Sequence, residues 1–147
     1  MLRVRYANRA DADFAGQDGY IATDVLVRKI DAREVMIAES DDIPVGYLRI
    51  EYLWSRVPYI ALIRVLPGHQ RRGSGRALLA FLESELYEAG HSVLLSSSQA
   101  DEPEPQEWHR HMGFVDCGRL QGINTDGIDE VFFRKPLDLS ARADSHG

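Results

Sequence analysis

The stretch "LPGHQRRGSGRALL", from Leu66 to Leu79, holds three glycines, three arginines and one histidine, and it has no acidic residue. It follows a nearly continuous apolar run, "PYIALIRVL", which begins at Pro58. After it, apolar residues recur at three- and four-residue spacing from Ala77 to Leu86, which predicts one buried stripe on a helix. We therefore predict a loop that joins a central strand, buried on both faces, to the start of a helix.

A loop of this kind suits a phosphate group. The first amides of a helix lack internal acceptors, and the positive end of the helix dipole lies beside them. Glycines let a ligand approach the main chain closely, and the side chains of Arg71, Arg72 and Arg76 supply positive charge. A plain glycine turn is the structural alternative. A Walker A loop is excluded because no Gly-Lys-Ser/Thr follows, and a G-x-G-x-x-G fingerprint fails at Leu78.

The composition of the whole chain limits the classes of protein to consider. Its 147 residues, 44% of them hydrophobic, predict one soluble globular domain. A net charge of -6 argues against a nucleic-acid partner. Cys117 is the only cysteine, so we expect a reducing cytoplasm and no metal site. We expect no membrane partner, since no apolar run is long enough to span a bilayer.

The pattern of the remaining sequence predicts an α/β (α+β) fold. Its mixed central sheet has a parallel strand–helix–strand core flanked by helices. The expected domain covers residues 1–137, and the polar tail at 138–147 is expected to be disordered. Strands are expected at 2–6, 34–39, 45–54, 58–66, 91–98, 115–117 and 130–135. Helices are expected near 11–19, at 23–30 with Thr23 or Asp24 as N-cap, from 77 to a stop at Gly90, and at 107–112.

The run from Val65 to Leu79 resembles the acetyl-coenzyme A motif of the GNAT superfamily of N-acetyltransferases. That motif reads V-x-P-x-x-[QR]-x-x-G-x-[GA], and every constrained position matches between Val65 and Gly75. The order of elements is also similar, so the resemblance covers roughly residues 2–136. It implies a GNAT-like fold with acetyl-coenzyme A as cosubstrate.

The resemblance also implies roles for individual residues. Main-chain groups of Ile63, Arg64 and Val65 would pair with the pantetheine arm as an added strand would, and the Val65 amide would stabilise the oxyanion. The remaining implied cofactor contacts are Gln70, Arg71, Arg72, Gly73, Ser74, Gly75 and Arg76, with backbone amides from Arg71 to Arg76 holding the pyrophosphate.

A second motif, "WHRHMGF" from Trp108 to Phe114, departs from the family pattern. Many relatives have a tyrosine four residues before Gly113, and its hydroxyl protonates the departing thiolate; this chain has His109 there. A histidine suits general acid catalysis near neutrality. The alternatives are a structural polar residue or a pantetheine contact, and the sequence leaves all three open. Trp108 is predicted to serve packing.

Other contacts and the catalytic base are less defined. The asparagine that many relatives carry at the entry to this helix is absent, because Asp101 or Glu102 falls there. Candidate bases are Glu51, Glu102 and Glu104, each of which also suits a plain surface carboxylate. The serines at 96–98 are candidates to line the acceptor pocket, and Cys117 is predicted to be a small buried filler.

We therefore predict an N-acetyltransferase that moves an acetyl group from acetyl-coenzyme A to a primary amine by direct attack in a ternary complex. The acceptor is a small-molecule or a protein amine, and the acidic balance favours a cationic one. A homodimer is compatible with the sequence. Two alternatives remain: a non-catalytic acyl-coenzyme A-binding or sensor module, and a nucleotide or phosphate binder that uses the same loop.

Overall fold

A computed structural model describes residues 1–138. The tail that the sequence predicted to be disordered, residues 138–147, lies outside the described residues except for Asp138. The strands of this part are β1 (Leu2–Tyr6), β2 (Val35–Ser40), β3 (Ile43–Leu53), β4 (Val57–Val65), β5 (Val93–Gln99), β6 (Val115–Leu120) and β7 (Glu130–Pro136). Its helices are α1 (Ala12–Ala15), α2 (Thr23–Asp31), α3 (Ser74–Glu88) and α4 (Pro103–His111), with a 3-10 turn, η1 (Arg9–Asp11), before α1.

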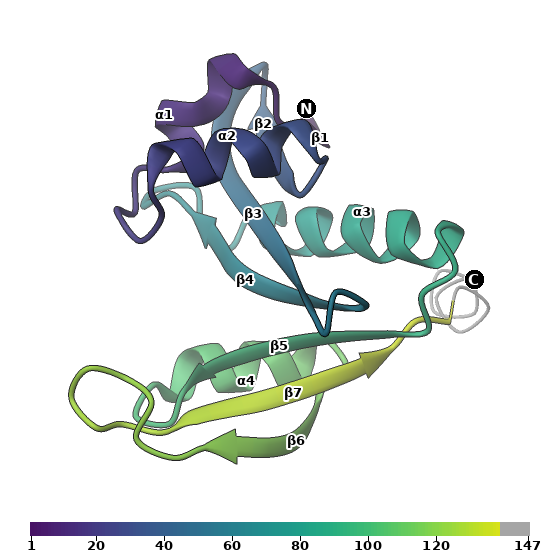
Figure 1. Cartoon of the computed structure of the whole chain (residues 1–147). Helices are drawn as coiled ribbons and strands as arrows, with labels where there is room; N and C mark the ends of the chain where they lie inside the picture. Colours follow the sequence, from purple (N-terminus) through teal and green to yellow (C-terminus); the bar gives the residue numbers. More distant parts are fainter. Residues whose placement is uncertain (139–147) are drawn as a thin grey trace. The chain divides into compact units, whose positions relative to one another are not determined.

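The strands form a mixed sheet with the order β1-β2-β3-β4-β5-β7-β6. Strands β1, β2 and β3 pair antiparallel, as do β5, β7 and β6. Strands β4 and β5 run parallel, and α3 connects them along the chain (Figure 1). The predicted α/β fold with a parallel strand–helix–strand core is confirmed.

The chain divides into two compact units. Unit 1 comprises Met1–Glu51 and Ala61–Leu82, and unit 2 comprises Tyr52–Ile60 and the chain from Glu83 onward. Each boundary falls inside β3, β4 or α3 rather than in a loop. No linker therefore separates the units along the chain.

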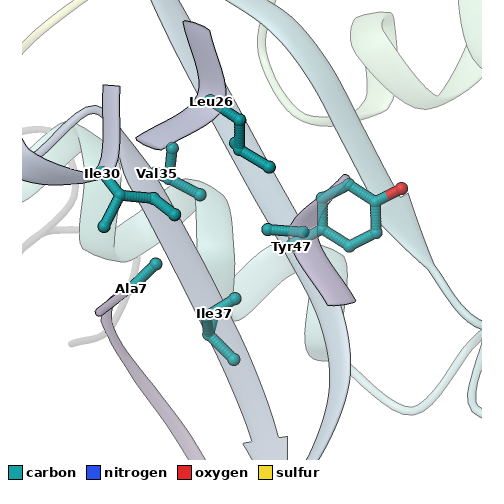
Figure 2. Close-up of a cluster of buried hydrophobic side chains, with 7 residues drawn as sticks. Ala7, Leu26, Ile30, Val35, Ile37 and Tyr47 are labelled. Carbon is teal, nitrogen blue, oxygen red and sulfur yellow. The ribbon is translucent and has the colours of Figure 1, made fainter. Parts of the chain in front are cut away.

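Unit 1 has a core where α1 and α2 meet the strands. Leu26 and Ile30 are four residues apart on α2, which puts both on one helix face. Alternate positions of β2, Val35 and Ile37, face the same cluster. Figure 2 shows these side chains in one cluster with Ala7 and with Tyr47 of β3. The buried members are Ala7, Ala15, Leu26, Ile30, Val35, Ile37 and Tyr47.

A buried ion pair fixes the connection between α1 and α2 to β3. The Arg49 guanidinium donates to both carboxylate oxygens of Asp18 at 2.6 and 3.0 Å, and also to the Ala15 carbonyl at 2.7 Å. The Tyr47 hydroxyl donates to the same carboxylate at 2.9 Å. Burial by itself would raise the pKa of Asp18. The hydrogen bonds from Arg49, the Tyr20 amide and Tyr47 outweigh it and hold the pKa of this carboxyl well below its usual range.

Unit 2 contains the antiparallel strands β5, β7 and β6 with helix α4 beside them (Figure 1), together with the end of β3, the start of β4 and the end of α3. Its buried apolar side chains include Leu94, Phe114 and Phe133. Every residue of β6 is exposed, including Cys117. The prediction that Cys117 is a buried filler was therefore wrong: β6 is the last strand in the order and pairs, within the described chain, only with β7.

Three further expectations need correction. The N-cap of α2 is Ala22, without a side-chain bond, because Thr23 already has helical geometry. Helix α4 begins at Pro103, four residues earlier than predicted, because proline suits the first helical position. Strand β4 is not buried on both faces, since its last five residues are half-buried or exposed. Among residues 1–138, no helix combines the length and apolar character needed to cross a membrane.

Candidate functional site

The glycine- and arginine-rich loop leads directly into α3 in unit 1. The loop takes positive φ angles at Gly68 (87°), Arg71 (64°) and Gly73 (90°), and α3 begins at Ser74. A Cβ placed on Gly73 would have only the Leu2 side chain near it, at 3.9 Å. The backbone at Gly73 is therefore open to its surroundings, and its left-handed conformation favours glycine.

Six consecutive amides of this loop, from Arg71 to Arg76, have no backbone or side-chain acceptor within residues 1–138. The first internal bond of the helix runs from the Ala77 amide to the Gly73 carbonyl, at 2.9 Å. Ser74 is buried, whereas the arginines at both ends of the run are exposed. Such a row of unused donors at the positive end of a fifteen-residue helix is suited to binding an anion.

The arginines around these amides differ from most others in the chain. Arg64, Arg71, Arg72 and Arg76 form no ion pair with any residue in the described part. By contrast, Arg3, Arg5, Arg9, Arg28, Arg49, Arg110 and Arg119 each pair with a carboxylate. The loop therefore combines unneutralised guanidinium groups with unused amides, which suits a di-anionic ligand such as a pyrophosphate.

The end of β4 offers main-chain groups beside this loop. The Leu66 amide donates to the Val45 carbonyl of β3 at 2.8 Å. Because backbone directions alternate along a strand, the main-chain groups of Val65 and Ile63 point away from β3, and those of Arg64 point toward it. The resemblance implied Ile63, Arg64 and Val65 as pantetheine contacts. Of these, Ile63 and Val65 have main-chain groups that point away from β3, whereas those of Arg64 point toward it. The Gln70 side chain donates to the Val65 carbonyl at 3.3 Å.

The residues of this loop fit the phosphate and pantetheine parts of coenzyme A. The fit rests on the unused amides, on the open backbone at Gly73 and on the half-buried apolar surface of Ile63 and Val65. Gly46 on β3 contributes by close packing, because a Cβ there would lie 2.9 Å from the Arg64 carbonyl oxygen. A side chain at position 46 would therefore push the Arg64 carbonyl away, and glycine there allows the backbones of β3 and β4 to lie close together.

His109 is buried in unit 2, with 4% of its surface exposed. Its Nδ1 lies 2.7 Å from the Pro105 carbonyl, which only accepts, so Nδ1 carries the proton. Nε2 then accepts from the Ser96 hydroxyl at 2.7 Å. The ring stacks on Phe133 at 4.6 Å. Both nitrogens are therefore occupied in the neutral ring.

Burial lowers the pKa of His109 below its ordinary value, although the hydrogen bond to the Pro105 carbonyl opposes the shift. The neutral ring is thus favoured more strongly than in an exposed histidine. The general acid role suggested by the sequence stays a prediction. Trp108 is half-buried and meets the His109 ring edge-on at 5.2 Å, a contact of the packing kind that the sequence predicted.

The carboxylates that the sequence suggested as bases, Glu51, Glu102 and Glu104, are all exposed. A different carboxylate, Glu130 of β7, lies in a hydrogen-bonded group with Ser97 of β5 and Tyr59 of β4. Sequence reasoning missed this group, because three strands far apart in the chain contribute to it. The only sequence signal was the serine run.

Within residues 1–138, no three side chains of His, Cys, Asp or Glu gather as a metal site would require. His111, two residues beyond His109, is exposed.

Comparison with known proteins adds to this geometry. Residues 5–114 match the model of the acetyltransferase (GNAT) family. The chain is 31% identical over 102 residues to aminoglycoside N(6')-acetyltransferase type 1 of Stenotrophomonas maltophilia, covering 69% of this chain and 52% of that protein. It is 27% identical over 88 residues to the L-amino acid N-acyltransferase MnaT of Escherichia coli (strain K12), covering 58% and 51%.

The chain thus spans about half the length of the curated relatives it matches. Among solved structures, yncA of Salmonella typhimurium with its cofactor acetyl-CoA superposes with a TM-score of 0.77 at 20% identity, covering 93% of this chain and 94% of that one. The family match extends over the central strand, the loop and helix α4, which are the parts described above. This chain belongs to the GNAT acetyltransferase family.

Proposed function

We propose that this protein is an N-acetyltransferase that transfers the acetyl group of acetyl-coenzyme A to a primary amine. The observation that carries the proposal is the row of six unused amides at the start of α3, with three arginines that have no carboxylate partner among residues 1–138. Membership of the GNAT family supports the choice of acetyl-coenzyme A as the ligand.

The loop would hold the cosubstrate by its phosphate end. Amides from Arg71 to Arg76 would donate to the pyrophosphate, and Arg71, Arg72 and Arg76 would balance its charge. Gln70 would border the site. The pantetheine arm would pair with outward main-chain groups of Ile63 and Val65, as an added strand does. These apolar residues would also cover the arm and exclude water.

Catalysis would need little covalent chemistry from the protein. The amine nitrogen attacks the thioester carbon, and the Val65 amide is the donor proposed for the oxyanion. The C–S bond then breaks, and the sulfur leaves with the electron pair. His109 is proposed as the acid that protonates this thiolate. In the neutral ring its proton is on Nδ1 and bonded to Pro105, so this role requires the ring to release that bond or to gain a second proton.

The acceptor is proposed to be a small-molecule or protein amine, without a nucleic-acid partner. The two curated relatives are named for transfer to an aminoglycoside and to L-amino acids, and both names place the acyl group on nitrogen. The acidic balance of the chain favours a cationic acceptor. We further propose a cytoplasmic location and leave a homodimer open.

One observation favours a second candidate, a non-catalytic acyl-coenzyme A-binding or sensor module. The residue at the family's tyrosine position is a buried histidine with both nitrogens occupied. Such a protein would bind acetyl-coenzyme A through the same loop and release no thiol when amines are added.

The loop assignment is tested with Gly73→Val, measured by calorimetric titration of coenzyme A. Valine disfavours the φ of 90° at this position, so we expect the amides to turn away and affinity to fall at least about tenfold. Gly90→Val is the matched control, since Gly90 has a φ of 94° at the far end of α3 and open space around it. Equal affinity of both variants would overturn the assignment. Displacement of coenzyme A by ATP would indicate a general nucleotide site instead.

The reaction is tested by thiol release from acetyl-coenzyme A with kanamycin, L-methionine, spermidine and a peptide with a free N-terminal alanine. We expect release with at least one of these amines. Binding of acetyl-coenzyme A without release on any of them would favour the sensor module.

A further inference from the structure

Arg64, near the end of β4, lies on the same face of the sheet as the core of unit 1. Leu62 packs against that core, and side chains two residues apart in a strand share a face. Val65 lies on the other face, because a Cβ on Gly46 would be 3.4 Å from the Val65 side chain and 3.5 Å from the Leu78 side chain of α3. The Arg64 side chain therefore projects from the face that α1 and α2 cover, away from α3.

Tyr47 of β3 is the neighbour of Arg64 across the two strands. Strands β3 and β4 are adjacent and joined by residues 54–56, so they run antiparallel. The bond from the Leu66 amide to the Val45 carbonyl places these two residues opposite each other, and two residues further along it places Arg64 opposite Tyr47. Burial raises the pKa of Tyr47, and the positive charge of Arg64 opposes that rise, which agrees with their closeness.

The carboxylate bonded to Tyr47 leaves no acceptor for Arg64. Oδ2 of Asp18 accepts from the Tyr47 hydroxyl at 2.9 Å and from Arg49 at 2.6 Å. Oδ1 accepts from Arg49 at 3.0 Å and from the Tyr20 amide at 2.9 Å. Four donors thus fill the four acceptor positions of a carboxylate. Arg64 is exposed and forms no ion pair within residues 1–138, so this face of unit 1 keeps a positive charge that the described chain does not neutralise.

The Arg64 side chain begins next to the proposed reaction centre. The peptide bond that joins Arg64 to Val65 carries the Val65 amide, which is the donor proposed for the thioester oxygen. A group held by the Arg64 guanidinium therefore lies within the length of one side chain of the thioester carbon. The side chains of Ile63 and Val65 share the opposite face, so the guanidinium approaches from the side that these two residues leave free.

We propose that Arg64 binds a carboxylate of the acceptor, so that the preferred acceptor is an amine that also carries a carboxylate, as an amino acid does. This inference rests on the proposed function and names the class of acceptor within it. A guanidinium is suited to this role because it donates two parallel hydrogen bonds to one carboxylate. With its carboxylate fixed, the acceptor holds its amine in reach of the thioester carbon.

The local charge here differs from the charge of the whole chain. The net charge of -6 favours a cationic acceptor through the average field, but that field is weak beside a single unpaired charge at contact distance. The free charge beside the end of β4 is positive. We therefore expect an acceptor with a negative group close to its amine to be preferred over a polyamine.

The test compares two acceptors with their own primary amides, L-methionine with L-methioninamide and β-alanine with β-alaninamide. The amide keeps the amine but has no negative charge. We expect kcat/KM for thiol release to be at least about tenfold higher for the acid than for the amide in at least one pair, as the loss of a hydrogen bond between charged groups implies. In Arg64→Gln this ratio should fall to within about twofold of one, mainly through KM.

Two further variants separate a specific contact from a general effect. Arg64→Lys should keep part of the ratio, because it retains the charge without the planar fork of the guanidinium. Arg56→Gln is the matched control, since Arg56 is exposed just before β4 and forms no ion pair in the described residues. This variant should keep the full ratio.

The outcomes distinguish this inference from the function on which it rests. Equal rates for acid and amide in the unmodified protein, or a ratio that survives Arg64→Gln, would overturn the carboxylate contact while leaving the acetyltransferase intact. A loss of coenzyme A affinity in Arg64→Gln with an unchanged ratio would assign the side chain to the cosubstrate instead. If no amine releases thiol with the unmodified protein, the proposed function fails, and this inference fails with it.

Discussion

At the scale of single residues, His109 is the position where this chain departs most from the family motif. The pattern has a tyrosine there, whose hydroxyl can both donate and accept. The histidine instead gives its proton to the Pro105 carbonyl and accepts from Ser96. Its ring thereby ties α4 to β5, and burial keeps it neutral. The same residue is thus suited to hold the helix whether or not it handles a proton.

Replacing His109 with phenylalanine separates these roles. The ring stack on Phe133 survives, but the Ser96 hydroxyl and the Pro105 carbonyl lose their partners, so we expect a loss of about 1–3 kcal/mol in the free energy of unfolding. If His109 is also the acid, kcat falls more than coenzyme A affinity. Urea unfolding and steady-state kinetics measure the two effects, with the exposed His111→Phe as control. An unchanged kcat would retire the acid role.

At the scale of elements, the connection between α1 and α2 depends on a buried ion pair as well as on the packing of Ile21 against the core of unit 1. Residues 16–22 carry no regular structure, yet Asp18 within them is paired with Arg49, whose side chain is 5% exposed. Breaking a buried pair costs far more than its net contribution, because the remaining charge stays in the interior. This connection is therefore held to β3 largely by the contacts of Asp18 with Arg49 and Tyr47.

We expect Asp18→Asn to lower the free energy of unfolding by about 3–5 kcal/mol, because Arg49 loses its counter-charge. The matched control is Asp24→Asn, whose pair with Arg28 is exposed on both sides and should cost at most about 0.5 kcal/mol. Chemical denaturation of the two variants in parallel gives the comparison. Similar losses in both variants would contradict the importance of the buried pair.

The sequence predicted the positions of helices and strands better than it predicted which of their residues are buried. Periodicity located α3 and the parallel core, because an apolar stripe and a glycine stop are local signals. Strand β4 looked fully buried for the same reason, but burial depends on neighbours that composition does not reveal. Cys117 was misplaced because a strand pattern does not say which strand lies at an edge. The outcome for the candidate site is similar. The glycine- and arginine-rich loop could be predicted because its residues are contiguous in the sequence. The contact of Tyr59, Ser97 and Glu130 could not be predicted, because these residues come from three strands that only folding brings together.

At the scale of the whole molecule, an acidic chain keeps one local concentration of free positive charge. Acids outnumber lysine and arginine by 23 to 17, and seven arginines are already paired with carboxylates. The loop arginines form no ion pair within the described chain, although other arginines pair with acids far away in the sequence, as Arg49 does with Asp18. The net charge of the chain therefore says little about the ligand of this loop, whereas the absence of acidic residues from Leu66 to Leu79 favours an anion there.

The charge pattern also predicts how stability depends on pH, in two windows. The pKa of His109 is lower in the folded chain than its ordinary value of about 6.5, so its contribution is complete above that pH and declines as the pH falls below it. The pKa values of Asp11 and Asp18 are lowered mainly by hydrogen bonds from Arg5 and Arg49, so their contributions persist until the pH falls below about 4 and then decline.

Urea unfolding between about pH 8 and pH 3 should therefore show a shallow loss of stability below about 6.5 and a steep loss below about 4. The first loss should vanish in His109→Phe, and the second should weaken in Asp18→Asn. Amide hydrogen exchange can locate each window, with protection falling first in β5 and α4 of unit 2 and later in residues 16–22 and β3 of unit 1. A single acid transition, unaltered by His109→Phe, would show that the buried histidine does not govern the stability of its unit.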